Sequence, residues 1–390
     1  MKTFQREIRL IYHSIKDLLI RLLPNLNRKS DYRYAFLVHP RNINDVYRKY
    51  PALKVLSPKV LEFFLKLYWP VVLSRVTGLK SLKDGREIDG IILTIPLTAR
   101  QMMENRDLAL KRIIQGIRLA EKYGAKLIGL GGFTSSLSKG GLDLIDRTNI
   151  NITTGHAYTA YNVTENLFKL TDIMDISKTH VVVAIVGAAG SIGSTSAKLI
   201  ARKGFNNLIL IDLERKHHTF PELIKELEFL NPKISISTSH QIKDVEIADF
   251  IITATNSPEA VIKYRDLKNG AIIIDDAQPS DISPDILTRD DVLAIEAGIV
   301  HTPGVLNHFD FNLKDKHDNF CCMAEVMVLA AIEHNSHYVI NRATLEDVDK
   351  VSELGKKLGF RIGEFQNFIE SIRYDKILKI KDIIHARNKL

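Results

Sequence analysis

The feature that most constrains the fold is a run of β-branched residues that leads into a glycine-rich loop and then a helix. Residues 180–186 are almost entirely apolar and predict a buried strand. Gly187, Gly190 and Gly193 follow at once, and an apolar helix continues to residue 201. A second strand over 207–211 ends in an acid about 20 residues beyond the glycines. This strand–loop–helix–strand unit predicts a dinucleotide-binding βαβ fold.

The glycine loop predicts contacts to a nicotinamide dinucleotide. Glycines allow the backbone to approach a pyrophosphate, and the helix amino terminus attracts its negative charge. A carboxylate after the second strand bonds an unphosphorylated ribose, which favours NADH, but Arg215 and Lys216 lie close enough in sequence to leave NADPH open. A glycine-rich turn without a ligand is the alternative. The expected cofactor-binding residues are Gly187, Gly190, Ser191, Ile192, Gly193 and Asp212.

Strands and helices alternate elsewhere in the chain, which predicts the α/β class. Strands are expected over 89–95, 126–130, 248–254 and 271–275, and a helix over 106–123. We predict an N-terminal α/β substrate domain and a Rossmann-type NAD(P)-binding domain, with C-terminal helices that pack back on the latter. The expected segments are an amphipathic N-terminal helix over 1–30, the substrate domain over 31–177, the Rossmann domain over 178–310 and a C-terminal helical region over 311–390.

The composition excludes a disulfide scaffold. Among 390 residues there are two cysteines, which are adjacent, so a reducing cytoplasm is the simpler expectation. A formal charge of +8 favours an acidic partner, such as nucleic acid, an anionic membrane or an acidic carrier protein. We expect no signal peptide, because charges break up the N-terminal apolar residues and no small-residue cleavage site follows. We expect no membrane-spanning helix, because no apolar run is long enough without a charge or a proline.

Two apolar segments near the N-terminus have alternative interpretations. The first is an amphipathic helix that either packs on the next domain or lies on an anionic bilayer through residues 1–30. Its apolar stripe comprises Phe4, Ile8, Ile11, Ile15, Leu18, Leu19 and Leu22. The second segment, over 60–73, is rich in aromatic residues that form either plain core or a wall for an aliphatic chain. These are Phe63, Phe64, Tyr68 and Trp69.

Cys321 and Cys322 open an apolar helix, for which Asp318 or Asn319 is the expected N-cap. In the first turn of a helix, the dipole stabilises a thiolate and makes it a better nucleophile. Apolar core filling is the alternative role for such cysteines, and a vicinal redox pair is another.

Four segments together resemble the aldehyde-forming long-chain acyl-[acyl-carrier-protein] reductases of cyanobacteria. They are residues 130–135, 153–161, the glycine loop at Gly187, and 320–327. The resemblance implies that a cysteine accepts a fatty acyl group from acyl carrier protein or coenzyme A, and that a nicotinamide hydride then releases the aldehyde. The acylated cysteine of that family corresponds to Cys322 in this chain.

The chain also departs from that family. His156 stands where asparagine is expected, and residues 1–30 and those beyond about 375 have no counterpart. The family resembles NADPH users with an arginine after the second strand, whereas here that strand ends in Asp212. We predict Cys322 and His156 as catalytic residues and no metal site. A tetrahedral intermediate requires a donor to its oxyanion. The candidates are His156, Tyr158 and Thr154, with His301 and His308 as weaker ones.

The leading prediction is therefore NAD(P)H-dependent reduction of a fatty acyl thioester, with acyl carrier protein or acyl-CoA as the partner and no nucleic acid. One alternative is a shikimate- or amino-acid-type NAD(P) dehydrogenase with a structural cysteine. Another is a non-enzymatic protein that binds a nucleotide as a sensor. The expected location is the cytoplasm, with peripheral membrane contact through residues 1–30 as the further alternative.

Overall fold

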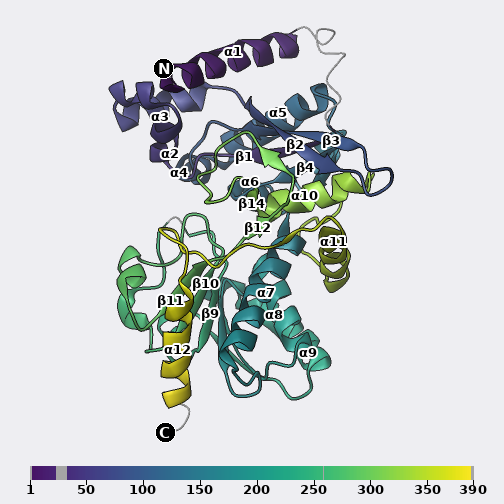
Figure 1. Cartoon of the computed structure of the whole chain (residues 1–390). Coiled ribbons are helices and arrows are strands. Elements are labelled where there is room, and N and C mark those ends of the chain that lie inside the picture. Colours follow the sequence, from purple (N-terminus) through teal and green to yellow (C-terminus); the bar gives the residue numbers. More distant parts are fainter. Residues whose placement is uncertain (1, 23–32, 258, 388–390) are drawn as a thin grey trace. The chain divides into compact units, whose positions relative to one another are not determined.

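The computed structural model describes residues 2–22, 33–257 and 259–387 (Figure 1). Within them the chain forms two compact units, each built from three separate stretches. The first unit comprises Met1–Gly155, His301–Asn341 and Glu353–Phe360. The second unit comprises His156–Val300, Arg342–Ser352 and Arg361–Leu390.

The first unit is built on a mixed six-stranded sheet. Its strand order is β13-β2-β3-β1-β4-β5. Strands β3, β1, β4 and β5 are parallel, whereas β2 and β13 join antiparallel. The strands are β1 (Tyr34–Val38), β2 (Val71–Lys80), β3 (Glu87–Thr94), β4 (Leu127–Leu130), β5 (Asn151–Thr153) and β13 (Leu306–Asn307).

Helices cover both faces of this sheet. Helix α5 (Arg106–Lys122) packs its apolar side on one face and ends before Gly124, whose φ of 91° suits glycine. Helix α10 (Cys321–Ala331) lies on the other face, where a Cβ at Gly129 would stand 3.1 Å from Val326. The remaining helices of this unit are α1 (Lys2–Leu22), α2 (Ile43–Lys49), α3 (Pro58–Leu67), α4 (Ala99–Glu104) and α6 (Phe133–Leu137).

The second unit contains a six-stranded, wholly parallel sheet. Its order is β11-β10-β9-β6-β7-β8, and all neighbours are parallel. The chain runs outward from β6 through β7 to β8, then crosses to the other side of β6 and runs outward again through β9 and β10 to β11. This is the doubly wound order of dinucleotide-binding domains, so the predicted Rossmann-type α/β class is confirmed. The strands are β6 (Val182–Val186), β7 (Asn207–Ile211), β8 (Ser235–Ser239), β9 (Phe250–Thr253), β10 (Ile272–Asp275) and β11 (Leu293–Glu296).

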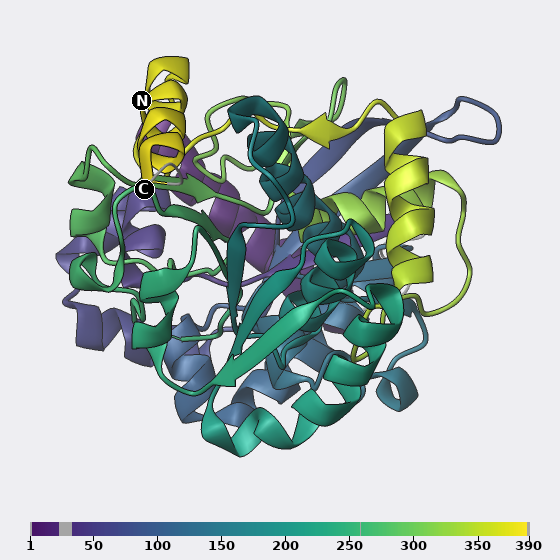
Figure 2. The ribbon, with the colours of Figure 1, turned by 90° about the horizontal axis from the view of Figure 1, so that it is seen from below.

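Successive residues of these strands alternate between two apolar clusters. Val183 and Ile185 face the cluster that the helices cover, while Ala184 and Val186 face the opposite one. Figure 2 shows the teal strands of this sheet with their helices beside them. The helices that contribute to the first cluster are α7 (His156–Met174), α8 (Ser191–Arg202), α9 (Phe220–Leu230) and α12 (Tyr374–Arg387).

Four further elements lie near the sequence boundaries of the units: β12 (Ile299–His301), β14 (Asp318–Phe320), α11 (Leu345–Lys357) and β15 (Arg361–Ile362). Over the described ranges, no helix combines the length and apolar character needed to cross a bilayer.

The structure does not bear out the core interpretation of the two N-terminal apolar segments. The α1 side chains Ile8, Ile11 and Ile15 are exposed, so this part of the apolar stripe does not complete a core. The side chains of Phe4 and Leu22 lie outside those that the structure describes. In α3, Phe63 and Phe64 are 59% and 51% exposed, so they are neither core residues nor buried walls for a chain. Residues 23–32, which include the basic Arg28 and Lys29, lie outside the described residues.

Candidate functional site

The glycine loop connects β6 to α8 in the second unit, as its sequence predicts. Gly187 has a φ of 89°, and a Cβ there would lie 2.5 Å from the Ala254 carbonyl oxygen. A Cβ at Gly193 would lie 2.3 Å from the Gly187 oxygen, so these two glycines permit the tight turn and the close helix–strand contact. Gly190 is the N-cap of α8, and a Cβ there would meet only the Gly187 oxygen, at 3.1 Å.

The amino end of α8 is therefore open to a ligand at Gly190. Ser191 and Ile192 are half-buried in the first helical turn, whose backbone N–H groups have no partner within a helix. An open turn with this dipole suits a pyrophosphate, so the loop fits a dinucleotide.

Asp212 lies directly after β7 with its carboxylate turned to the glycine loop. One oxygen accepts the Ala189 N–H at 3.0 Å, and the other accepts the Leu213 N–H at 2.8 Å. Lys216 Nζ lies 3.2 Å from the latter oxygen. A carboxylate held here suits a ribose hydroxyl, while Lys216 places a cation beside the same position. The residues present therefore fit a nicotinamide dinucleotide of either kind.

A further segment, not found from the sequence, is hydrogen-bonded to the glycine loop and to the start of α8. Arg342 Nη2 donates to the Ala189 carbonyl oxygen at 3.1 Å, and the Ala343 N–H donates to Ser191 Oγ at 3.2 Å. Thr195 Oγ1 donates to the Ala343 oxygen at 3.1 Å. No local motif marks residues 342–343, because their role depends on contacts about 150 positions away in the sequence.

Three carboxyl groups gather at the end of β10 and in the loop that follows it. Asp275 accepts hydrogen bonds from Thr253 and Ser280, and Asp281 accepts one from Thr255. Burial raises the pKa of Asp281 to about 7, with the neighbouring Asp275 adding to the rise. Burial also raises the pKa of Asp276 well above its usual range. Parallel strands end together, so this cluster lies at the same edge of the sheet as the glycine loop.

The cysteines open α10 in the first unit, but without the expected cap. Phe320 is the N-cap, and no side chain caps this helix. The prediction of Asp318 or Asn319 is wrong because both belong to β14, where Asp318 bonds His301 and Asn319 Nδ2 donates to Thr302 Oγ1.

The two thiols differ in access. Cys321 is 1% exposed, whereas Cys322 is half-buried. Both lie at the positive end of the helix dipole, which favours a thiolate. Only Cys322 combines this position with partial exposure.

The loop after β5 presses against Cys322. Gly155 has a φ of 79°, and a Cβ there would lie 2.3 Å from both Cα and Cβ of Cys322. Glu325, one turn along α10 and fully buried, accepts hydrogen bonds from Thr153 Oγ1 and from the Gly155 N–H at 3.0 Å. Glu325 was not predicted as a functional residue, because its partners lie about 170 residues earlier in the sequence.

The hydroxyl of Thr154 is a candidate donor beside this contact. Thr154 is 1% exposed, and its Oγ1 has no hydrogen-bond partner among the described residues. A buried polar atom without a partner costs free energy and calls for a ligand or a functional explanation. The sequence had placed Thr154 among the oxyanion donors.

His156 and Tyr158 begin α7 in the second unit. His156 is half-buried, and desolvation lowers its pKa to about 4, so the imidazole is neutral at pH 7. Tyr158 is 1% exposed. A neutral imidazole can donate a hydrogen bond but carries no positive charge.

The other candidate histidines have partners of their own. His301 Nδ1 lies 3.0 Å from Asp318 Oδ1, and its ring and Asp318 share a cluster with the exposed Asp315. His308 Nε2 lies 2.9 Å from the exposed Thr77 hydroxyl. Neither contact involves the segment 153–155 or the start of α10.

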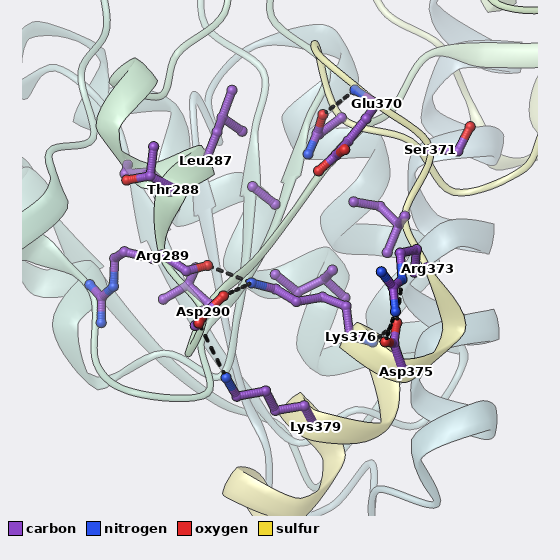
Figure 3. A pocket seen from close by; sticks show the side chains of 16 residues that line it. Leu287, Thr288, Arg289, Asp290, Glu370, Ser371, Arg373, Asp375, Lys376 and Lys379 are labelled. Atoms are coloured by element: carbon purple, nitrogen blue, oxygen red, sulfur yellow. Dashed lines mark hydrogen bonds and ion pairs between the residues drawn. The ribbon is translucent and has the colours of Figure 1, made fainter.

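A pocket of about 370 Å³ lies elsewhere in the second unit (Figure 3). Residues 286–290 and 292–294 line one side, and Lys376 and Lys379 of α12 line another. Both lysines face Asp290, at 4.0 and 3.5 Å. Residues 286–294 lead into the start of β11, so the pocket lies at the amino edge of the parallel sheet. The glycine loop follows the carboxyl end of β6 and so lies at the opposite edge. It is not the dinucleotide site.

The chain is similar to one family model and to individual proteins of other organisms. The family model of shikimate/quinate 5-dehydrogenases matches residues 170–297, which cover the Rossmann sheet. The aminotransferase PigE of a Serratia species is 29% identical over 306 residues, which are 77% of this chain. The chain spans only 35% of the length of PigE.

A long-chain acyl-[acyl-carrier-protein] reductase of Synechococcus elongatus is 27% identical over 305 residues. The match covers 71% of this chain and 82% of that reductase. Distant similarity thus links the chain to this reductase and to PigE. Together with the dehydrogenase match, it supports an NAD(P)-dependent oxidoreductase.

Two solved structures resemble the chain more remotely. The NAD-dependent malic enzyme of Thermotoga maritima is 13% identical, with a TM-score of 0.41 over 97% of this chain and 89% of that one. Quinate dehydrogenase from Corynebacterium glutamicum, solved with NAD, is 14% identical, with a TM-score of 0.29 over 63% of this chain and 79% of that one.

The contact between Gly155 and Cys322 yields a first prediction. Gly155→Ala should lower the thermal midpoint and change the rate at which iodoacetamide alkylates Cys322, because the new Cβ displaces the start of α10. Gly304→Ala is the matched control, since Gly304 has a φ of 80° but nothing within 4 Å of a Cβ. Both variants bear the left-handed cost of ~1–2 kcal/mol. Gly155→Ala should lose ~1–3 kcal/mol more. Equal stability and equal alkylation in the two variants would refute the contact.

The buried imidazole yields a second prediction. Below pH 6.5 the unfolded chain protonates His156 before the folded chain does, so acid lowers the free energy of unfolding between pH 6.5 and about 4. The loss is at most roughly 3 kcal/mol, and less for a half-buried ring. His156→Asn should flatten the fall in thermal midpoint from pH 7 to pH 5. The exposed His180→Asn variant should fall as wild type does.

Proposed function

We propose that this chain reduces a fatty acyl thioester to an aldehyde, with Cys322 as the acylated nucleophile and NADH or NADPH as the hydride donor. The observation that carries the proposal is the half-buried Cys322 at the amino end of α10, held against Gly155. The similarity to an acyl-[acyl-carrier-protein] reductase supports it. The acyl donor would be acyl carrier protein or coenzyme A, in a reducing compartment such as the cytoplasm that keeps the thiol free.

The first unit would perform the acyl transfer. The Cys322 thiolate attacks the thioester carbon, a new C–S bond forms, and the carrier thiolate leaves and takes up a proton. The amino end of α10 favours the thiolate before attack. The buried Thr154 hydroxyl would donate to the oxyanion of the tetrahedral intermediate, since it has no partner among the described residues.

The second unit would hold the cofactor. Residues 187–193 would bind the pyrophosphate, and Asp212 would bind the ribose. When bound, the cofactor supplies the hydride that converts the acyl-enzyme into an aldehyde and restores the Cys322 thiolate. His156, neutral at pH 7, would donate a hydrogen bond rather than a charge.

A shikimate- or quinate-type dehydrogenase is the second candidate, because that family model matches residues 170–297. In this case Cys322 would be structural. The two functions differ in whether a covalent acyl adduct forms.

Intact mass spectrometry separates the two. Wild-type protein incubated with palmitoyl-[acyl carrier protein] or palmitoyl-CoA should gain the mass of one acyl group. The adduct should disappear, with appearance of aldehyde, when NADH or NADPH is added. Cys322→Ala should abolish both signals, whereas the neighbouring Cys321→Ala is the matched control and should keep them, because Cys321 is buried and rotated by about 100° on the helix. A wild type that gains no adduct would favour the dehydrogenase.

Asp212 yields a test of cofactor choice. We expect wild type to prefer NADH, and Asp212→Ala to raise kcat/KM for NADPH relative to NADH by about tenfold or more, because removing the carboxylate removes repulsion of the 2′-phosphate and leaves Lys216 beside it. Lys216→Ala should move the ratio in the opposite direction. A wild type that already strongly prefers NADPH would show that Lys216, not Asp212, dominates the site.

A further inference from the structure

Helix α1 presents its apolar stripe outward. Ile11, Tyr12 and Ile15 are 58%, 61% and 55% exposed, and Ile8, Leu18 and Leu19 share their side of the helix. These positions follow the i, i+3, i+4, i+7 spacing of a single helical face. A helix that served only to complete the core would bury this face.

Polar groups fix α1 in this orientation. The carboxylate of Asp17 is fully buried and accepts hydrogen bonds from the Val72 N–H at 2.8 Å and from the Tyr123 hydroxyl at 2.5 Å. The Tyr68 hydroxyl donates to Ser14 Oγ on the same side of the helix. Turning the apolar stripe inward would break these bonds and leave buried polar groups unsatisfied. The hydrogen bonds on the inner side therefore keep the apolar stripe facing outward.

A second helix of the same unit repeats the arrangement. In α3, Leu61 is buried, whereas the residues at i, i+3, i+4 and i+7 of the opposite side are exposed. These are Val60, Phe63, Phe64 and Leu67. Tyr68, which caps the end of α3, makes the bond to Ser14, so the two helices adjoin. We call the ten exposed apolar residues of the two helices the α1–α3 surface.

The sequences of both helices carry more basic than acidic residues. Exposed Lys59 and Lys66 belong to α3, and its acid, Glu62, is half-buried and paired with Arg100 at 2.7 Å. In α1, one of the two acids is the buried Asp17. The α1 sequence otherwise contains Glu7 and the basic residues Lys2, Arg6, Arg9, Lys16 and Arg21.

We propose that the α1–α3 surface docks on an anionic lipid bilayer, with both helices lying in the interface. Apolar helical faces rich in Phe, Leu and Ile beside Lys and Arg are the chemistry that binds such a surface. Neither helix is suited to crossing it. Large exposed apolar patches mark interaction sites, and the cationic surroundings select the anionic bilayer. The proposal goes beyond the proposed reaction and does not depend on it.

Vesicle co-sedimentation of the full chain tests the proposal. Vesicles of equal parts phosphatidylcholine and phosphatidylglycerol should bind wild type at low salt, and pure phosphatidylcholine vesicles should bind it more weakly. Raising the salt should weaken binding to the anionic vesicles, because the Debye length falls from about 10 Å at 0.1 M to about 3 Å at 1 M.

Two double variants examine the helices separately: Ile11→Ser with Ile15→Ser, and Phe63→Ser with Phe64→Ser. Each should lower the partition coefficient at least about tenfold, because each removes two side chains that would enter the lipid. The matched control, Phe229→Ser with Ile247→Ser, changes exposed apolar residues of the second unit and should bind as wild type does. All three should keep the wild-type thermal midpoint, since the changed residues are exposed.

Several results would overturn the proposal. The first is wild type that does not sediment with anionic vesicles at low salt. The second is a pair of α1 and α3 variants that bind as well as wild type. A third is light scattering that shows a dimer without lipid and a monomer for both variants, which would assign the surface to a second copy. The last is that these variants lose binding to acyl carrier protein but still bind vesicles, which would assign the surface to that protein.

Discussion

The buried carboxylate of Glu325 organises the first unit around the cysteine. It joins the end of β5, through Thr153 and the Gly155 N–H, to the first turns of α10. A carboxylate removed from water is tolerated only where such donors surround it, so this interaction fixes the start of the helix. Because Gly155 lacks a Cβ, the loop can touch the backbone of Cys322. Any chemistry at this thiol depends on that fit.

The proposed reaction would draw on groups from both units. The first holds a partly exposed thiol at a helix amino terminus, and the second holds an open glycine loop, an acid after β7 and a group of buried carboxyls. Partial exposure of Cys322 is what our acyl-transfer proposal requires, whereas the dehydrogenase alternative requires only the second unit.

Local patterns in the sequence predicted the second unit well, because its signals are local. The β-branched strands, the glycine loop and Asp212 all occupy their expected elements. Prediction failed where a distant partner decides the outcome. The sequence predicted Asp318 as an N-cap, but its carboxylate bonds His301 instead. Likewise, the sequence left open whether the α1 stripe faces a core or a bilayer, because the bonds from Val72 and Tyr123 to Asp17 on the other side could not be foreseen. Glu325 and Arg342 were missed for the same reason.

The interleaving of the chain between the units has a consequence for how this protein can be divided. A fragment that stops at Gly155 would contain five strands of the first sheet but not α10, which covers one of its faces. A fragment over 156–300 would lack Arg342 and Ala343, which bond the glycine loop, and α12, whose isoleucines belong to its core. No single cut therefore yields either unit whole. A fragment cut at either boundary leaves apolar surface of its sheet without the helix that covers it.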